Sequence, residues 1–260
     1  MSTHSMPATA YTLEGRQGAP VLVLANSLAA TPQMWDSQCT LWRKKFQVLR
    51  YSYRGHGETE PLGASTSVEQ LAQDLLSLLD ERGIQRFSFA GISLGGMLGL
   101  HMAATEPLRV ERLVAANFRY YQTDVTRPQW DQRIALVKEK GIAAIVDGTA
   151  DRWLTEAFRQ NHPDRDAWLR AMIRTTSVDG FLACAKAVRD YDARPLLKSI
   201  RCPVMLISGV EDLAAPTAHI DELAHLLKTS TRVSLAAAHL SNIERSDEFS
   251  QLIINFMDAA

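Results

Sequence analysis

The chain lacks any apolar run that approaches the roughly 20 consecutive residues a membrane-spanning helix needs. Its N-terminal stretch, "MSTHSMPATAYTLEG", lacks both the basic segment and the apolar segment of a secretory signal peptide. We therefore expect a cytoplasmic protein with no membrane partner.

An excess of positive charge is also missing. The 28 lysines and arginines are balanced by 29 aspartates and glutamates, so the formal net charge is -1, and no basic block occurs. A nucleic-acid-binding surface needs clustered positive charge, so we expect no nucleic-acid partner. The hydrophobic content of 46% is typical of a globular domain, and we expect a small-molecule substrate and a monomer or homodimer.

Cysteines are few, and no cofactor motif is present. Cys39, Cys184 and Cys202 are scattered and odd in number, which argues against a disulfide framework or a zinc site and predicts reduced, buried thiols. Neither a phosphate-binding loop nor a dinucleotide fingerprint occurs. Four histidines, His4, His162, His219 and His225, lack the spacing of metal ligands. We therefore expect no cofactor and no metal.

What the sequence does contain is an alternation of buried strands and amphipathic helices. Short apolar runs that end in small or polar residues predict strands at residues 19–29, 46–53, 87–92, 112–117, 202–209 and 231–238. Helical periodicity predicts helices at 67–82, 94–105 and 247–258. This alternation is typical of an α/β fold with a mostly parallel, doubly wound sheet.

The alternation stops within the chain. Residues 120–197 have a helical pattern, are rich in Arg, Trp and Asp, and contain no convincing strand. We therefore expect a core domain made of residues 1–119 and 198–260, with a helical cap inserted at 120–197.

Three residue types of hydrolytic chemistry follow three of the predicted strands. Ser93 lies in "GISLG", a G-x-S-x-G pattern between a strand and a helix, which is the nucleophile elbow of α/β-hydrolases. Glu211 and Asp212 follow a later strand, and His239 follows the last. Ligands bind beyond the carboxyl ends of parallel strands, and the chain order Ser, acid, His is that of the α/β-hydrolase triad.

Each residue type has a chemical role. A serine hydroxyl needs a base to take its proton, and a histidine such as His239 can take that proton and later return it to the leaving group. Asp212, which we favour over Glu211, would orient the imidazole. The backbone N–H groups of Leu94 and Leu28 are the expected oxyanion hole, the latter in the loop "ANSLAA".

Simpler interpretations compete with these roles. Ser93 could be an ordinary helix N-cap, and His239 a loop histidine. His56, in "RGHG", is expected to be a structural residue that is hydrogen-bonded to the backbone, and His101 to be packed against its helix or to cap it.

Seven segments spread over nearly the whole chain are shared with one family: "NSLAATPQMWDSQ", "VLRYSYRGHGETEP", "GISLGGMLGL", "DRWLTEAF", "DGFLACAKAVRDYD", "SGVEDLAAP" and "AAAHLSNIERSDEF". On these the chain resembles the 3-oxoadipate enol-lactonases of the α/β-hydrolase superfamily, enzymes of aromatic-acid breakdown in the β-ketoadipate pathway. The resemblance implies hydrolysis of an enol-lactone to a 3-oxo dicarboxylate without metal or cofactor. Where the family usually continues "NTAA", this chain has "NFRYYQ" at residues 117–122, which bears on the exact substrate.

A substrate of this kind carries a carboxylate that needs a cation or donors in the pocket. Arg152 and Trp153 lie in a segment that matches the family, Arg119 lies in the divergent segment, and Ser27 follows the first buried strand. We expect these four residues to contact substrate. The alternative is that the arginines form surface salt bridges and that Trp153 belongs to the cap core.

Three other functions fit the same pattern. A hydrolase of carbon–carbon bonds in ring-cleavage products shares the fold and triad, and a general carboxylesterase shares the chemistry. A non-catalytic ligand receptor on this fold is the third.

Overall fold

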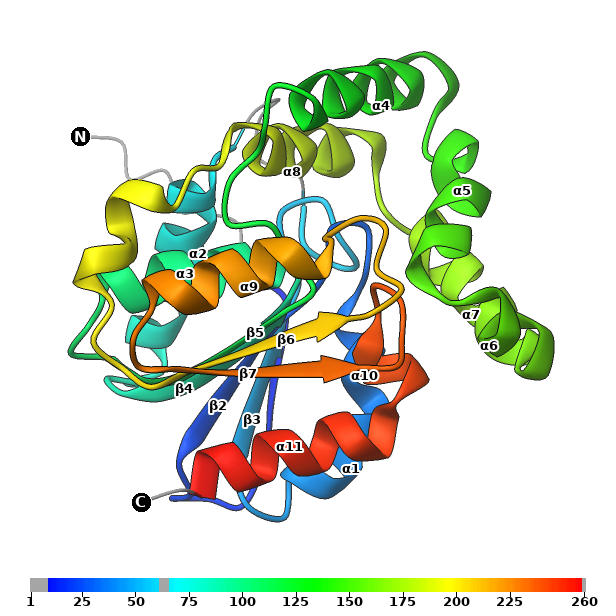
Figure 1. The fold of residues 1–260 in the computed structure, drawn as a ribbon. Helices are drawn as coiled ribbons and strands as arrows, with labels where there is room; N and C mark the ends of the chain where they lie inside the picture. The colour runs from blue at the N-terminus through cyan, green and yellow to red at the C-terminus, as the bar shows by residue number, and fades with distance from the viewer. Residues whose placement is uncertain (1–8, 61–65, 259–260) are drawn as a thin grey trace, which may run out of the picture.

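The computed structural model describes residues 9–60 and 66–258, so the first eight residues of the N-terminal stretch, His4 among them, lie outside the described residues. Within the described part, seven strands form one sheet in the order β1-β3-β2-β4-β5-β6-β7 (Figure 1). They are β1 (Tyr11–Gly15), β2 (Val21–Ala25), β3 (Gln47–Tyr51), β4 (Phe87–Ile92), β5 (Val110–Ala116), β6 (Val204–Gly209) and β7 (Ser230–Leu235).

All neighbouring strands are parallel except β1, which pairs antiparallel with β3. The mostly parallel α/β sheet is therefore confirmed, whereas β1 was not predicted. β7 ends at Leu235, before the end of the apolar run at 231–238, because the chain leaves the sheet there. It then contacts the loop after β6, where Glu211 N donates to Ala237 O at 3.0 Å.

After β2 the chain adds β3 on one side of it and then β4 on the other side, so the direction in which strands are added to the sheet reverses at β2. In open parallel sheets, such a reversal leaves a crevice outside the carboxyl ends of the neighbouring strands, here β2 and β4. The loop that begins with Asn26 follows the carboxyl end of β2, and Ser93 follows the carboxyl end of the neighbouring strand β4.

Helices cover both faces of the sheet (Figure 1). One face carries α2 (Val68–Glu81), α3 (Leu94–Thr105) and α9 (Thr217–Leu226), and the other carries α1 (Asp36–Trp42) and α11 (Ser246–Asp258). The short elements are η1 (Pro32–Trp35), η2 (Arg194–Ser199) and α10 (Ser241–Glu244). The three helices expected from periodicity are all present, with ends that differ by at most one residue.

The segment between β5 and η2 is helical, as expected. It contains α4 (Thr126–Lys140), α5 (Ala143–Trp153), α6 (Glu156–Asn161), α7 (Pro163–Arg174) and α8 (Val178–Asp190). The two connections to this segment are joined where Tyr121 and Asp192 form an isolated antiparallel bridge. Its division from the core at residues 120 and 197 stays a prediction.

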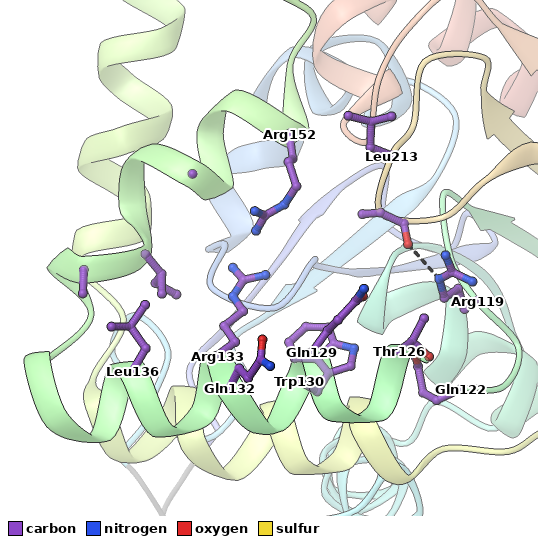
Figure 2. Close-up of a pocket in the computed structure, with 14 residues that line it drawn as sticks. Arg119, Gln122, Thr126, Gln129, Trp130, Gln132, Arg133, Leu136, Arg152 and Leu213 are labelled. Atoms are coloured by element: carbon purple, nitrogen blue, oxygen red, sulfur yellow. Dashed lines mark hydrogen bonds between the residues drawn. The ribbon is translucent and has the colours of Figure 1, made fainter. Parts of the chain in front are cut away.

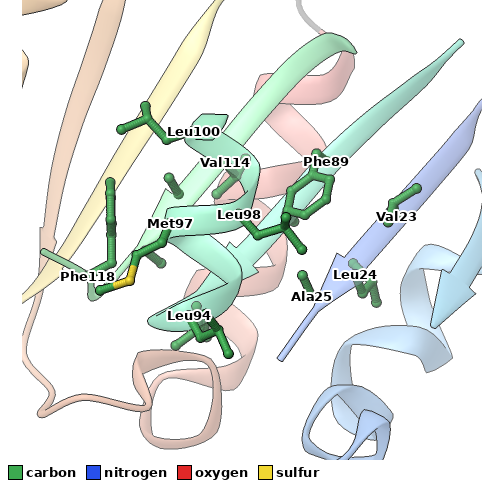
Figure 3. Close-up of a cluster of buried hydrophobic side chains, with 14 of the residues drawn as sticks. Val23, Leu24, Ala25, Phe89, Leu94, Met97, Leu98, Leu100, Val114 and Phe118 are labelled. Atoms are coloured by element: carbon green, nitrogen blue, oxygen red, sulfur yellow. The ribbon is translucent and has the colours of Figure 1, made fainter. Parts of the chain in front are cut away.

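Helix α3 forms the centre of the core (Figure 3). Its residues from Leu94 to Ala104 are all buried, so it is apolar around its whole circumference and packs against β4, β5 and β2. A helix enclosed in this way holds the residue at its N-terminus rigidly. That residue is Ser93.

Two further sequence-based expectations concern thiols and membranes. Cys39, Cys184 and Cys202 are free and buried. Among the described helices, none is long and apolar enough to cross a bilayer.

Candidate active site

Ser93 occupies a strained turn between β4 and α3. Its backbone dihedrals are φ 59° and ψ -115°, a region that residues other than glycine rarely adopt. The turn is possible because its flanking residues lack side chains: a Cβ on Gly91 would lie 2.2 Å from Gly95 O, and one on Gly95 would lie 2.2 Å from Ala25 O. Strand and helix thus approach each other as a nucleophile elbow requires.

The competing interpretation of Ser93 was a helix N-cap. Ser93 does stand at the N-cap position of α3, but its side chain makes no capping hydrogen bond. By contrast, Ser67 at the start of α2 accepts a hydrogen bond from Gln70 N at 3.2 Å. The Ser93 hydroxyl is therefore left for another partner.

Asp212 and His239 form a buried pair. His239 Nδ1 lies 2.8 Å from Asp212 Oδ2, and both side chains are at most 5% exposed. Because a carboxylate can only accept, Nδ1 carries the proton and Nε2 is left with its lone pair. Glu211, the other candidate acid, is exposed at the surface.

Both oxygens of Asp212 are saturated with donors. Oδ2 also accepts from Asn117 Nδ2 at 3.1 Å, while Oδ1 accepts from Ala214 N and Ala215 N, each at 2.9 Å. Burial by itself raises the pKa of Asp212, but the neighbouring His239 and these hydrogen bonds outweigh burial and lower it below its usual range. The carboxylate therefore stays ionised opposite the imidazole.

Asn117 is a site residue that the sequence analysis did not single out. Its φ is +50°, and its Nδ2 donates both to Asp212 Oδ2 and to Ala238 O, each at 3.1 Å. Its Oδ1 accepts from Ser241 Oγ at 2.6 Å. An asparagine directly after a strand is one of the few residues that tolerate a left-handed conformation, and this was the available signal.

Of the expected oxyanion donors, Leu28 lies in the loop after β2 and Leu94 is the first residue of α3. In the described part of the chain, neither Leu28 N nor Leu94 N donates a hydrogen bond to another residue. The loop that carries Leu28 is shaped by His56, whose Nε2 accepts from Ala29 N at 3.1 Å, where Ala29 has a φ of 64°. His56 Nδ1 lies 3.0 Å from Arg54 O, so this histidine is structural, as expected.

An inner cavity of about 50 Å³ brings several candidates together. Ser93, His239, Leu28, Ser27 and Trp153 all line it. Ser93 and His239 share this cavity but form no hydrogen bond with each other; such contacts commonly tighten only when substrate binds. The Ser27 hydroxyl is buried there without a hydrogen-bond partner.

Comparison with known proteins shows the family of this chain. Residues 22–252 match the model of the alpha/beta hydrolase family. The chain is 31% identical to 3-oxoadipate enol-lactonase 2 of Acinetobacter baylyi, over 94% of this chain and 90% of that one. The crystal structure of an enol-lactonase from Burkholderia xenovorans matches with a TM-score of 0.93 and 34% identity over 96% of both chains.

The chain belongs to the alpha/beta hydrolase family. Its similarity to enol-lactonases makes it a hydrolytic enzyme that acts on esters or lactones. A putative carbamate hydrolase, RutD of Klebsiella pneumoniae, is 28% identical over 93% of this chain and 92% of that one.

In this hydrolase, the helical segment contacts the candidate histidine directly. The Trp153 ring stacks on the His239 imidazole, with centroids 5.9 Å apart and planes inclined by 30°. Trp153 O also accepts from Leu240 N at 3.0 Å. Trp153 is buried, so it is both part of the packing and part of the cavity wall.

Glu244, which was not predicted from the sequence, is a second link between the helical segment and the loop that carries His239. Its carboxylate accepts from Ala238 N at 2.8 Å, and from the amide and the hydroxyl of Thr155 at 3.2 and 2.6 Å. Thr155 is the N-cap residue of α6, and Ala238 directly precedes His239. Glu244 therefore joins the helical segment to the loop that carries the imidazole.

The inner cavity adjoins an outer cavity of about 510 Å³, and Arg119, Arg133 and Trp130 line both (Figure 2). Of the two arginines predicted to contact substrate, Arg119 lines both cavities, whereas Arg152 lines only the outer one. Arg133, on α4, was not predicted, because an arginine on a polar helix gives no sequence signal of its own.

His101 is packed within α3 without a hydrogen-bond partner for its Nδ1. Among residues 9–60 and 66–258, no group of three or more His, Cys, Asp or Glu side chains is placed to hold a metal.

Proposed function

We propose that this hydrolase opens a small lactone, or cleaves a small ester, that carries a carboxylate, and that 3-oxoadipate enol-lactone is the substrate that best represents this class. The observation that carries the proposal is the buried Asp212–His239 pair in contact with the cavity onto which the strained Ser93 turn opens. Enol-lactonase relatives that match along nearly the whole chain support it.

The reaction begins with Ser93. Its Oγ forms a bond to the lactone carbonyl carbon while His239 Nε2 takes the hydroxyl proton, and the carbonyl π electrons move to the oxygen. The N–H groups of Leu28 and Leu94 stabilise that oxyanion. Asp212 stabilises the imidazolium that results.

Collapse of the tetrahedral intermediate breaks the bond between the carbonyl carbon and the ring oxygen. The imidazolium returns its proton to that oxygen, so the ring opens as an enol and the acyl group remains on Ser93. A water molecule, deprotonated by His239, then attacks the acyl carbon and displaces Ser93 Oγ, which recovers its proton. The product is a carboxylate, and the enol tautomerises to the ketone.

The proposal is tested by assaying 3-oxoadipate enol-lactone hydrolysis and by treating the protein with a fluorophosphonate. We expect turnover, and an adduct whose mass maps to Ser93. Ser93→Ala should lose both, whereas Ser77→Ala, which changes a serine on α2 outside both cavities, should keep both.

Other outcomes would separate the alternatives. Retention of more than a few per cent of the rate in Ser93→Ala would overturn the nucleophile assignment. If ring-cleavage diketones are cleaved in preference to lactones, the protein is the carbon–carbon bond hydrolase. If simple aryl esters are the preferred substrates, it is the carboxylesterase. If neither an adduct nor turnover is found, it is the non-catalytic receptor.

A further inference from the structure

The outer cavity is lined by three arginines and no acid. Among the described residues that line it, Arg119, Arg133 and Arg152 are the charged ones, and neither cavity has an aspartate or glutamate in its wall. Figure 2 shows Arg133 and Arg152 approaching each other from α4 and α5, with Arg119 on the opposite side. Like charges that face one cavity without a counter-charge repel one another.

Arg133 is the most constrained of the three. One terminal nitrogen donates to Thr149 Oγ1 at 2.6 Å, but its Nε is buried without a hydrogen-bond partner. Burial, together with the positive charge of Arg152, lowers the pKa of Arg133 to about 9. A half-buried cation with a like charge beside it and no counter-charge in the cavity wall is stabilised by an anion that enters the cavity.

Two other arginines of the same helical segment are paired with aspartates. Arg170 forms ion pairs with Asp147, Asp151 and Asp166, and Arg189 pairs with Asp131. Arg152 has no ion pair or hydrogen bond with any described residue. Its neighbour Asp151 is engaged by Arg170, so the aspartates of this segment leave the cavity-facing arginines free.

Arg119 is held at a separate position. Its Nε donates to Ala214 O at 2.9 Å, and the residue lines both cavities (Figure 2). It forms no ion pair with a described residue: Asp212 attracts it, but the four donors already described occupy that carboxylate. Burial lowers the pKa of Arg119 despite this attraction.

We infer that the substrate carries two acidic groups in addition to the bond that is cleaved, one bound between Arg133 and Arg152 and the other by Arg119. This inference rests on the proposed function and narrows its substrate class from carboxylated lactones to lactones or esters with two free carboxylates; 3-oxoadipate enol-lactone, which has one free carboxylate, represents the reaction but should bind more weakly than a lactone with two. A cavity of about 510 Å³ has room for such a molecule beyond the reacting centre at Ser93.

The test measures binding rather than turnover, so it does not depend on the choice of lactone. Three acids are titrated into Ser93→Ala by calorimetry at fixed ionic strength: hexanoate, adipate and butane-1,2,4-tricarboxylate. One carboxylate of each mimics the group released at Ser93, which leaves none, one and two for the arginines. Each step should tighten binding about tenfold or more, the range of a charge-assisted hydrogen bond.

Arg119→Gln in the Ser93→Ala background should remove the gain from adipate to the tricarboxylate and keep the gain from hexanoate to adipate. Arg119→Lys should retain part of the gain, which shows that charge and not folding is responsible. Arg127→Gln, on α4 but outside both cavities, should change nothing. Equal affinity for adipate and the tricarboxylate, or equal weakening of all three acids by Arg119→Gln, would overturn the inference.

These outcomes are separable from those of the proposed function. If the binding series is as expected and no lactone or ester is turned over, the two-anion site stands and the proposed reaction is wrong. If lactones are hydrolysed and the tricarboxylate gains nothing over adipate, the reaction stands and the second anionic group is wrong.

Discussion

Asp212 accepts a hydrogen bond from His239 Nδ1 at 2.8 Å, and the two residues lie 27 positions apart in the chain, after different strands of one sheet. The pairing is possible because β6 and β7 are parallel neighbours, so the loops beyond them leave the sheet at the same edge. Asn117, after β5, supports the pair from the next strand along.

Asp212→Asn should lower kcat by several orders of magnitude and cost about 1–3 kcal/mol of unfolding free energy, because an amide nitrogen in place of Oδ2 cannot accept from Asn117 Nδ2. The amide can donate to His239 Nδ1 and so select the tautomer in which Nε2 carries the proton and cannot act as a base. Steady-state kinetics on an enol-lactone check this. Glu211→Gln is the matched control, since that side chain is exposed; a larger loss there than in Asp212→Asn would show that the wrong acid was chosen.

Glu244→Gln should lower both stability and kcat. The amide places a donor where the carboxylate accepts from Ala238 N, Thr155 N and Thr155 Oγ1, so at least one donor loses its partner, at a cost of about 1–3 kcal/mol. Urea unfolding and kcat measure the two effects. Glu248→Gln, at a half-exposed site on α11, should change neither, and an unaltered kcat in Glu244→Gln would mean that this link does not position His239.

Stability should fall in mild acid because of His56. Burial lowers the pKa of His56 to about 4, whereas an unfolded chain binds the proton near pH 6.5. Between these values the unfolded state holds more protons, so the free energy of unfolding falls by about 1.4 kcal/mol per pH unit as pH drops from 6.5 towards 4. Urea titrations of wild type and His56→Gln at pH 7 and pH 5 should show a steeper decline in the wild type; equal declines would contradict the assignment.

Two glycine substitutions should change the free energy of unfolding in opposite directions. In Gly95→Ala the new Cβ would lie 2.2 Å from Ala25 O, a backbone atom of β2, so we expect a loss of about 1–3 kcal/mol or more and a displaced Ser93. In Gly148→Ala, within α5, the nearest atom is Arg152 Nη1 at 3.7 Å, and the helix should gain about 0.5–1 kcal/mol. Thermal unfolding distinguishes them, and a neutral Gly95→Ala would show that the elbow tolerates a side chain.

Much of the architecture was predictable, because it depends on local patterns. The apolar runs that became β2, β4, β5 and β6 and the periodicity of α2 reflect burial on one or both faces, a property that each segment expresses by itself. Ser93 was identifiable for the same reason: the two glycines, the strand before it and the helix after it are adjacent in sequence. β1 was missed because a short, half-exposed edge strand has little hydrophobic signal.

The contacts that assemble the site were decided by the tertiary structure alone. The sequence by itself determined the fold class, the strained serine turn and the chain order of Ser93, the acid and His239. Only the folded chain placed Asp212 inward and Glu211 outward, brought Asn117 to the carboxylate, and directed Arg119, Arg133 and Arg152 into one cavity. The physical reason is that direction and pairing of polar side chains depend on partners far away in sequence, whereas hydrophobic periodicity is a property of each segment alone.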